Sequence, residues 1–597
     1  MHGYRGTILR VNLTEQTIQK EALDLDMARK YIGGRGLGTK IMMDEVDPNV
    51  DPLSPENKLL FVTGPLTGTP TPTGGRYMVV TKGPLTGTIA SSNSGGKWGA
   101  ELKMAGYDVI IFEGKAEKPV YLAIEDDKVE LRDAGHLWGK IVDDTTADIL
   151  KEMPEKTKVS CIGPAGEKLS LMGCIMNDVD RAAGRTGVGA VMGSKNLKAI
   201  AVRGTGKVEL ADEEGLAAVV KEHTKMLREN GITGEGLPTF GSAILVNIIN
   251  ESGILPTNNF QTSQADYAEE ISGERMTEKY LKRKHPCYRC PIGCGRWIEL
   301  DGKEGGGPEY ETLWAFGSDC GVDNIEDIMR ANFLCNELGI DTISMGSTIA
   351  AAMELYQEGL IKDEELDGMP LEFGNGEAMV EWTRRTGLRE GFGDKMADGS
   401  YRLTDSYGRS DLSMTVNKQE LSAYDPRGVQ GQGLSYATSN RGGCHVRGYL
   451  ISPEILAAPE AIDRFTTEGK ATWTKIFQDL TAVIDSVGLC LFTSFALGAT
   501  QYREMLNAAT GQNLTDEELM EAGDRVWNIE RLFNLKAGID PKNDTLPKRL
   551  LEDPVADGPS KGYITDLKTM LPQYYKERGW DEGGVPTDET IEKLGLK

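Results

Sequence analysis

The first third of the chain is a succession of short apolar stretches separated by glycine, proline and threonine, a pattern that predicts β-strands. The expected strands are at residues 7–13, 59–63, 77–81, 109–113, 158–163 and 198–203. Beyond these strands, apolar positions recur at helical spacing, which predicts helices. The expected helices are at residues 213–230, 324–338, 346–360, 471–487 and 515–534. Residues 365–445 have neither period and are expected to be rich in loops.

This change of period separates a β-rich N-terminal part from a mainly helical remainder. We predict an α+β protein with a β-rich N-terminal domain at residues 1–208 and two mainly helical domains at residues 209–415 and 416–597. A chain of 597 residues is too long for a single hydrophobic core, and several domains provide enough buried volume to enclose a cofactor.

Composition narrows the functional classes. Glycine, at 72 residues, is about twice as frequent as usual, which predicts many tight turns and close approaches of the backbone. Nine cysteines, an odd number, do not indicate a disulfide framework and fit a reducing cytoplasm. The net charge of -25 argues against a nucleic-acid or anionic-membrane partner. No apolar run is long enough to predict a membrane span, so we expect a soluble cytoplasmic protein.

Glycine-rich segments are concentrated in the N-terminal domain. The phrase Gly-Pro-Leu-Thr-Gly-Thr occurs at residues 64–69 and 83–88, which predicts two related turns on one rim of a sheet. Three further glycine-rich stretches, at residues 33–38, 92–97 and 181–189, carry arginine or lysine. None matches the G-x-G-x-x-G motif of dinucleotide-binding domains or the P-loop motif of nucleoside triphosphatases. Plain turns and a site for a phosphate-bearing ligand explain these three stretches equally well.

Three thiols lie close together in a loop that contains Cys287, Cys290 and Cys294. Such a loop supplies soft thiolate ligands for an iron-sulfur cluster or for zinc, and it requires a fourth ligand from elsewhere. The candidate is Cys490. Structural zinc sites usually combine two closely spaced ligand pairs, so a triplet with one remote cysteine favours iron-sulfur over zinc.

Two helix ends share one sequence form. Asn336 to Asp341 and Asp485 to Cys490 both read [DN]-x-x-G-[LI]-[CD], with a glycine where the helix is expected to stop. The repetition indicates either two similar ligands or one ligand bound twice. Glycine-stopped helices are common, and the pattern alone favours that simpler explanation.

In combination, these motifs resemble the tungsten-containing aldehyde ferredoxin oxidoreductase family over essentially the whole chain. The resemblance rests on the glycine-rich N-terminal domain, the cysteine loop and the following phrase at residues 307–311, the two helix-end phrases and the distant fourth cysteine. It implies a tungsten atom held by two pterin cofactors beside a four-iron four-sulfur cluster. It also implies that the first domain is a β base beneath the pterins and that each later domain contributes one helix end.

The resemblance also assigns roles to individual residues. The cluster ligands are expected to be Cys287, Cys290, Cys294 and Cys490, with Arg76 between cluster and pterin. Backbone carbonyls of Asn93 and Ala183 are expected to bind a magnesium ion that bridges the pterin phosphates. The other expected pterin-binding residues are Gly95, Arg185, Asn336, Gly339, Ile340, Asp341, Asp485, Gly488 and Leu489.

Two residues resemble the family's acid-base groups. His445, one of only five histidines, follows a glycine-containing segment that could bring its imidazole to a substrate. A structural histidine is the simpler alternative. Glu311 resembles a glutamate beside the metal that orients or deprotonates water. Glu309 is close enough in sequence to exchange roles with it, and Glu311 could also be a helix-capping residue.

The expected reaction is the reversible oxidation of an aldehyde to a carboxylic acid, with two electrons leaving through the cluster to ferredoxin or a ferredoxin-like subunit. One alternative is a relative with another substrate, such as a reductase subunit for aromatic thioesters. The second alternative is a non-catalytic iron-sulfur relay subunit. Some family members have an E-x-x-H metal bridge between subunits, but the corresponding positions here are Arg330 and Phe333. That bridge is therefore not expected here, and the sequence leaves the oligomeric state open.

Overall fold

The computed structural model describes residues 2–596, and its N-terminal region contains two six-stranded sheets. Strand order is β2-β1-β6-β3-β4-β5 in the first sheet and β11-β10-β9-β12-β7-β8 in the second. The first sheet consists of β1 (Thr7–Asn12), β2 (Thr17–Ala22), β3 (Leu59–Thr63), β4 (Tyr77–Lys82), β5 (Ile89–Ser94) and β6 (Val109–Glu113). The second consists of β7 (Val120–Glu125), β8 (Lys128–Asp133), β9 (Lys158–Cys161), β10 (Ile175–Asn177), β11 (Arg181–Ala183) and β12 (Leu197–Arg203).

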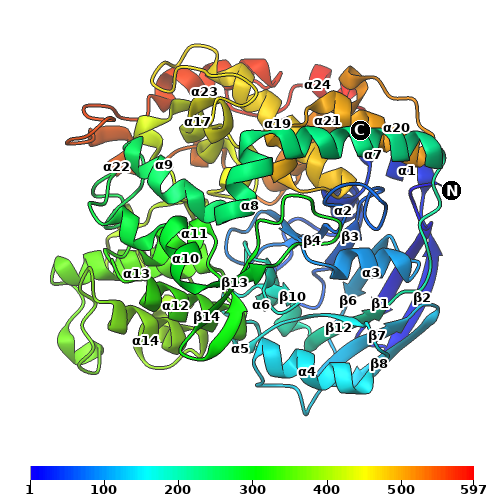
Figure 1. The fold of residues 1–597 in the computed structure, drawn as a ribbon, viewed down its shortest axis with the longest axis horizontal. Helices are drawn as coiled ribbons and strands as arrows, with labels where there is room; N and C mark the ends of the chain where they lie inside the picture. Colours follow the sequence, from blue (N-terminus) through cyan, green and yellow to red (C-terminus); the bar gives the residue numbers. More distant parts are fainter. Residues whose placement is uncertain (1, 597) are drawn as a thin grey trace.

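The inner strands of the first sheet are apolar on both faces because both faces are covered. Leu60 and Val62 of β3 pack with Leu37 of helix α2 (Gly34–Glu45) on one side. Phe61 on the opposite face packs with Trp98 of α3 (Trp98–Met104) and with residues of the second sheet. The β-rich region is thus layered, and Figure 1 shows it as the blue and cyan part of the ribbon.

Helices predominate in the rest of the described chain, which agrees with the predicted α+β class. They lie beside and above the β-rich region in Figure 1. The principal ones are α7 (Glu213–Glu229), α10 (Gly273–Tyr280), α11 (Tyr310–Phe316), α12 (Ile325–Leu338), α13 (Thr342–Gln357), α14 (Gly376–Gly387), α16 (Ser400–Ser406), α17 (Gln430–Thr438), α19 (Lys470–Val487), α20 (Ala499–Thr510), α21 (Asp516–Lys536) and α23 (Leu567–Glu577).

A small three-stranded sheet lies within the helical part. It consists of β13 (Leu281–Lys284), β14 (Arg296–Leu300) and β15 (Lys303–Gly306). Between residues 2 and 596, no single helix has the length and apolar character needed to cross a membrane. The paired segments Gly231–Phe240 and Ser242–Glu251 meet those criteria only in combination and are bent by 100°.

Residues 365–445 contain many loops, as predicted, but the stretch also includes helices α14, α16 and α17, which its sequence pattern does not predict. Every residue of α17 is buried, so this helix has no solvent face and its sequence shows no amphipathic period.

The glycine-rich stretch at residues 33–38 is the start of a helix and not a plain turn. Residues 34–38 open helix α2, where Gly36 and Gly38 allow close contact with neighbouring residues such as Val526 and Val80.

The repeated Gly-Pro-Leu-Thr-Gly-Thr phrases do not lie on one rim of a sheet. Residue Thr63 at the end of β3 pairs with Tyr77 at the start of β4, whereas Lys82 at the end of β4 pairs with Ile89 of β5. Since β3, β4 and β5 are successive antiparallel strands, the two phrases connect opposite ends of β4. The prediction failed because two turns that flank one strand cannot share an edge.

Each helix end that carries the repeated form lies against a glycine-proline turn of the β-rich region. A Cβ atom added to Gly64 would lie 2.3 Å from the carbonyl carbon of Val487, next to Gly488. A Cβ added to Gly163 would lie 2.3 Å from the carbonyl oxygen of Leu338, next to Gly339. The backbones therefore touch directly at both places, and any side chain larger than hydrogen would separate them.

Gly64→Ala tests this backbone contact. We expect it to lower the free energy of unfolding by about 1–3 kcal/mol, because the methyl group overlaps backbone atoms that cannot rotate away. We also expect lower metal content in the purified protein. Gly231→Ala is the matched control, since nothing lies within 4 Å of its added Cβ. Chemical denaturation and elemental analysis measure both effects, and equal stability of the two variants would contradict the contact.

Candidate active site

The structure brings together the four cysteines predicted to bind the cluster. Cys287, Cys290 and Cys294 are partly exposed in the loop between β13 and β14, whereas Cys490 is 8% exposed just beyond the end of α19. Nη2 of Arg76 donates a hydrogen bond to Sγ of Cys490 over 3.1 Å. Burial alone would lower the pKa of the Arg76 guanidinium, but the charges of nearby Cys490, Cys287 and Cys294 raise it. One arginine thus faces thiols from two distant segments.

The thiols themselves are held in an environment that disfavours free thiolates. Burial raises the pKa of Cys290 to about 11, and the neighbouring thiols Cys490 and Cys287 add to the shift. Burial likewise raises the pKa of Cys294 well above its ordinary value. A bound metal must therefore displace protons from these groups. Among residues 2–596, no group of three or more histidine, cysteine, aspartate or glutamate side chains has the geometry to hold a single metal ion.

A chain of hydrogen bonds joins the thiol group to the end of α19. Nη1 of Arg76 donates to Oδ1 of Asn93 over 2.7 Å, and Nδ2 of Asn93 donates to Oδ1 of Asp485 over 3.1 Å. Gly95 keeps this region compact, because a Cβ there would lie 3.0 Å from Sγ of Cys287. Arg76, Asn93, Gly95 and Asp485, all predicted from sequence as cofactor-binding residues, therefore lie next to the thiols.

Buried arginines surround Asp485. Arg447 forms an ion pair with Asp485, and Nη1 of Arg35 lies 3.5 Å from its Oδ2. Arg35 also makes two hydrogen bonds of 2.7 Å to Glu530. Burial, together with the neighbouring charges of Arg35 and Arg441, lowers the pKa of Arg447 to about 9. The negative charges near Arg447, which include Asp485, do not balance the positive charges of Arg35, Arg441 and Arg447.

Several polar atoms in this group have no partner of their own. Nε of Arg441, Nε of Arg447 and Oδ1 of Asn440 are buried and make no hydrogen bond. Buried polar atoms are normally paired, so donors and an acceptor left open beside excess positive charge fit an anionic polar ligand. The thiol of Cys444 responds to the same field, since Arg441, Arg447 and Arg185 lower its pKa in spite of its burial.

The first helix-end phrase has its own arginine. Nε of Arg185 donates to Oδ2 of Asp341 over 3.1 Å, and its Nη1 and Nη2 donate to the carbonyls of Gly443 and Glu420 over 2.9 and 2.7 Å. Asp341 also caps α13 by accepting from the amide of Ile343. Asp341 and Cys490 occupy the same place in the two helix-end phrases, and each accepts a hydrogen bond from an arginine of the β-rich region, Arg185 or Arg76.

The other predicted residues of the two phrases occupy the helix ends as expected. Gly339 and Gly488 end α12 and α19 in the left-handed conformation, with φ of 68° and 90°. Ile340 and Leu489 are buried at 2% and 0% exposure. The side chain of Asn336 makes no hydrogen bond to any described residue.

The predicted magnesium-binding residues lie on strands that belong to different sheets. Asn93 is on β5 and Ala183 is on β11. The amide of Arg185 donates to Oγ of Ser92 over 3.2 Å, which places the end of β11 beside β5.

His445 and Glu311, which the resemblance places beside the metal, lie side by side in the structure. Nε2 of His445 is 3.5 Å from Oε1 of Glu311, and Nδ1 is 2.8 Å from Oγ of Ser422. The amide of Ala423 donates to Oε2 of Glu311 over 3.0 Å, while the buried Oε1 makes no hydrogen bond. Glu311 is in the first turn of α11 but does not cap it, because its hydrogen bond goes to a different segment.

Burial changes the protonation of this pair. It raises the pKa of Glu311 to about 8, in spite of the amide of Ala423 and the charge of Arg185. It lowers the pKa of His445 well below its ordinary value, and Arg185 and Arg441 lower it further. At neutral pH the imidazole is therefore neutral, and the carboxyl group is poised to exchange a proton.

Glu309 has a different position from Glu311. It is the residue before α11, its Oε2 accepts a hydrogen bond from Ser242, and its Oε1 is 3.7 Å from Nη1 of Arg181. Arg181 in turn is influenced by the charges of Cys287 and Cys294. Glu309 therefore faces the thiol side of the site, which separates it from the His445 pair.

Three buried tyrosines form an aromatic wall at the His445 pair. Ring centroids of Tyr424 and Tyr449 lie 5.9 and 6.0 Å from that of His445, and their hydroxyl groups are 2.8 Å apart. The ring of Tyr310 is tilted by 43° against that of Tyr424, with centroids 5.5 Å apart, and its hydroxyl group donates to the carbonyl of Ala423 over 2.6 Å. Apolar rings on this side exclude water, which explains the perturbed pKa values of Glu311 and His445.

Sequence reasoning missed several residues of the site. Arg35 lies in a glycine-rich stretch for which a phosphate-bearing ligand and a plain turn are equally good explanations, and Arg441, Ser422, Tyr424 and Glu530 belong to no predicted site. The sequence signal that could have revealed the arginines is the presence of one histidine and two arginines within residues 441–447.

The two residues at the positions of the E-x-x-H motif make other contacts. Nη1 of Arg330 pairs with Asp327 at 2.8 Å, and the ring of Phe333 lies 5.1 Å from Nζ of Lys303.

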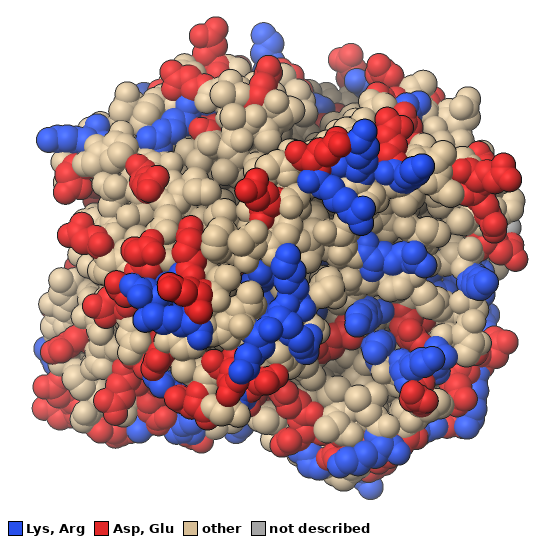
Figure 2. Space-filling model, viewed as in Figure 1, with Lys and Arg blue, Asp and Glu red and all other residues tan. Residues whose placement is uncertain are grey.

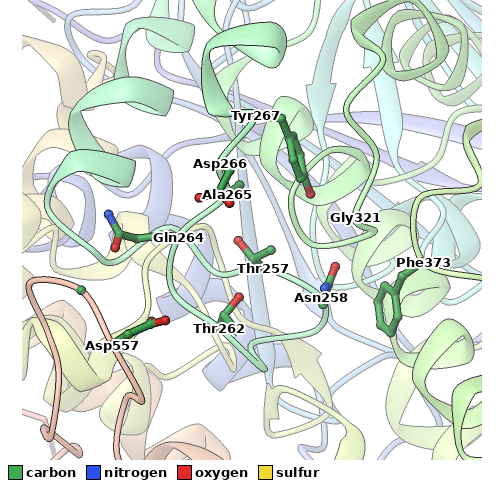
Figure 3. Close-up of a pocket in the computed structure, with 11 residues that line it drawn as sticks. Thr257, Asn258, Thr262, Gln264, Ala265, Asp266, Tyr267, Gly321, Phe373 and Asp557 are labelled. Carbon is green, nitrogen blue, oxygen red and sulfur yellow. The ribbon is translucent and has the colours of Figure 1, made fainter.

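A separate surface pocket of about 550 Å³ lies away from these groups. Figure 3 shows Thr257, Tyr267, Phe373 and Asp557 around it, on segments from the middle and the C-terminal part of the chain. None of the predicted cofactor-binding or catalytic residues lines it. The residues that line this pocket therefore give no reason to place the reaction there, in spite of its volume.

Comparison with known proteins gives one consistent result. Residues 8–204 match the family model described as aldehyde ferredoxin oxidoreductase, N-terminal domain, and residues 218–596 match that for domains 2 and 3. A tungsten-containing aldehyde ferredoxin oxidoreductase of Pyrococcus furiosus is 57% identical over 100% of this chain and 99% of its own length. The protein of that name from Pyrococcus abyssi is 54% identical, over 100% of both chains.

A solved structure has a similar fold. It is the active-site complex BamBC of benzoyl coenzyme A reductase with 1,5-dienoyl-CoA. The match has a TM-score of 0.87 and 27% sequence identity, and it covers 100% of this chain and 97% of that chain. The fold is therefore shared with a protein named for a different reaction, at much lower identity than the two Pyrococcus proteins.

Proposed function

Because the chain belongs to the aldehyde ferredoxin oxidoreductase family, we propose that it oxidises aldehydes with water to carboxylic acids and passes two electrons to ferredoxin. The observation that carries this proposal is the pairing of His445 and Glu311 beside buried arginines. Hydrogen bonds and an ion pair connect one of the buried arginines, Arg447, through Asp485, Asn93 and Arg76 to the thiol of Cys490. The overall reaction releases two electrons and two protons per aldehyde. The two acid-base groups provide the proton path, and the thiol group provides the electron exit.

We assign the anionic site to a tungsten-pterin cofactor. Open donors on Arg441 and Arg447 and the depressed pKa of Arg447 fit the phosphate groups of two pterins. Carbonyl groups of Asn93 and Ala183 would bind magnesium between those phosphates, since Mg²⁺ prefers oxygen ligands. A bound tungsten centre would supply the acceptor for the two electrons removed from the substrate carbon. We propose residues 1–208 as the β base, with residues 209–415 and 416–597 each contributing one helix end.

We assign Cys287, Cys290, Cys294 and Cys490 to a four-iron four-sulfur cluster. All nine cysteines are free of disulfides, which fits a cytoplasmic location. Cys490 follows the helix end that carries Asp485, so the cluster ligand and a cofactor-binding residue belong to one rigid segment. The hydrogen bonds from Arg76 through Asn93 to Asp485 provide a short physical link between the two sites.

Arg76→Gln tests the link. We expect the reduction potential of the cluster to fall by up to about 60 mV, because a charge-assisted hydrogen bond to Cys490 stabilises the more negative reduced cluster. Redox titration followed by electron paramagnetic resonance measures the shift. Arg283→Gln, a nearby exposed residue without a bond to a thiol, is the control. Equal potentials in both variants would make Arg76 an ordinary strand-flanking arginine.

We propose that the chain's own residues handle protons in the following way. The carboxylate of Glu311 accepts a proton from water that attacks the carbonyl carbon. His445, held by Ser422 through Nδ1, orients the substrate through Nε2. The aromatic wall keeps bulk water out, so that the proton transfer takes place at Oε1 of Glu311, which has no competing hydrogen bond.

Elemental analysis with pterin extraction, followed by an aldehyde assay with a viologen dye, tests the function. We expect tungsten, pterin, iron and sulfide together with dye reduction. Iron and sulfide without tungsten, molybdenum or pterin would instead indicate an iron-sulfur relay subunit. Full cofactor content without oxidation of simple aldehydes would favour a relative that acts on another substrate, such as an aromatic thioester.

A further inference from the structure

A basic stretch lies beside the thiols on a protein of net charge -25. Between Glu278 and Glu299 the chain has no acidic residue. The interval contains the cysteine loop and six basic residues, which are Lys279, Lys282, Arg283, Lys284, Arg289 and Arg296. Figure 2 shows lysine and arginine side chains gathered in a strip over the position of β13 in Figure 1.

Among these six cations are three that are exposed and have no carboxylate partner among the described residues. Arg283, Lys284 and Arg289 are exposed and form no ion pair with a carboxylate of any described residue, whereas Lys282 is paired with Glu299. Arg283 lies over the ring of Trp297 at 4.7 Å and contacts His285. We call Arg283, Lys284, Arg289 and Lys97 the basic rim.

Lys97 reaches the same place from the β-rich region. The carbonyl of Gly96, the residue before Lys97, accepts a hydrogen bond over 3.0 Å from the amide of Tyr288, the residue after Cys287. A Cβ on Gly95 would lie 3.0 Å from Sγ of Cys287. Lys97 is exposed, forms no ion pair with a described residue and makes no capping bond at α3. Two separate segments thus carry unpaired positive charge next to the Cys287 loop.

We propose that the basic rim is the docking surface for an acidic, cluster-containing electron-carrier protein. The proposal rests on the proposed function, which requires an exit for single electrons. Three thiols of the loop are only partly buried, so a carrier bound to the rim would lie directly over them. A carrier with an acidic face is attracted to the rim and repelled by the acidic remainder of the surface, which fixes where it binds.

The double variant Lys97→Glu/Lys284→Glu tests this surface. Neither side chain makes a hydrogen bond or ion pair with a described residue, so the fold should be retained. We expect kcat/KM for an acidic four-iron four-sulfur ferredoxin to fall about 10-fold or more at low salt, with a weaker dependence on salt than the unmodified enzyme. The rate with benzyl viologen, a cation, should not fall.

Lys568→Glu/Lys576→Glu on α23 is the matched control, because it makes the same charge change at exposed lysines on another element. Lys97→Arg/Lys284→Arg keeps the charge and should keep the ferredoxin rate. Equal losses in the test and control variants, or no loss in either, would overturn the docking surface. Absence of viologen activity in the unmodified enzyme would instead overturn the proposed function, so the two failures are distinguishable.

Discussion

His445→Asn is expected to lower kcat for aldehyde oxidation about 10²–10⁴-fold while tungsten, pterin and iron contents stay unchanged. The imidazole has one nitrogen held by Ser422 at 2.8 Å and the other directed to Glu311 at 3.5 Å. Burial and two arginines keep the imidazole neutral, so that Nε2 can accept or donate one hydrogen bond. Asparagine cannot reproduce both contacts in that geometry.

Steady-state kinetics with a viologen dye and elemental analysis measure this effect together. His136→Asn is the control, because His136 has a side chain that is 46% exposed and lies outside the site. Ser422→Ala should give a smaller loss, since it releases the imidazole without removing it. A His445→Asn enzyme with unchanged kcat would remove the imidazole from the mechanism.

Glu311→Gln is expected to lower kcat at least about 10²-fold and to abolish one ionisation in the pH profile. Burial raises the pKa of Glu311 to about 8. The proton-accepting carboxylate is therefore the minor form below that pH, and kcat should rise with pH through about 8 in the unmodified enzyme. Glutamine keeps the hydrogen bond to Ala423 but has no proton-accepting form.

The pH dependence of kcat separates Glu311 from its neighbour. Glu309→Gln should retain the rise of kcat with pH, because Glu309 faces Ser242 and Arg181. A Glu311→Gln enzyme that still shows the rise would assign the ionisation to another group. A flat profile at low activity would identify Glu311 as the base.

Local sequence signals predicted the helix ends and the cysteine loop well. Gly339 and Gly488 stop their helices in the left-handed conformation that glycine adopts without strain. Buried strands such as β3 and β6 were found because their apolar runs are continuous. The polar strands β2 and β8 were missed, since both lie at the outer part of a sheet and have few buried side chains.

Long-range contacts explain what the sequence could not predict. Arg35 and Glu530 are almost the whole chain apart but share two hydrogen bonds, and neither position has a local pattern that indicates the other. Helix α17 gave no amphipathic signal because all its residues are buried. The resemblance assigns Arg76 and Arg185 to the cofactor site, but their partners are distant in sequence, and only the structure identifies them as Cys490 for Arg76 and Asp341 for Arg185.

The buried arginine group has a consequence for how a cofactor is retained. Arg35, Arg185, Arg441 and Arg447 are between 0% and 6% exposed and come from the N-terminal and C-terminal parts of the chain. A ligand enclosed by them cannot leave by simple diffusion through the surface; the segments around it must first separate. Its lifetime on the protein is then governed by the rate of that separation rather than by its equilibrium affinity, so cofactor loss and local unfolding share one rate-limiting step.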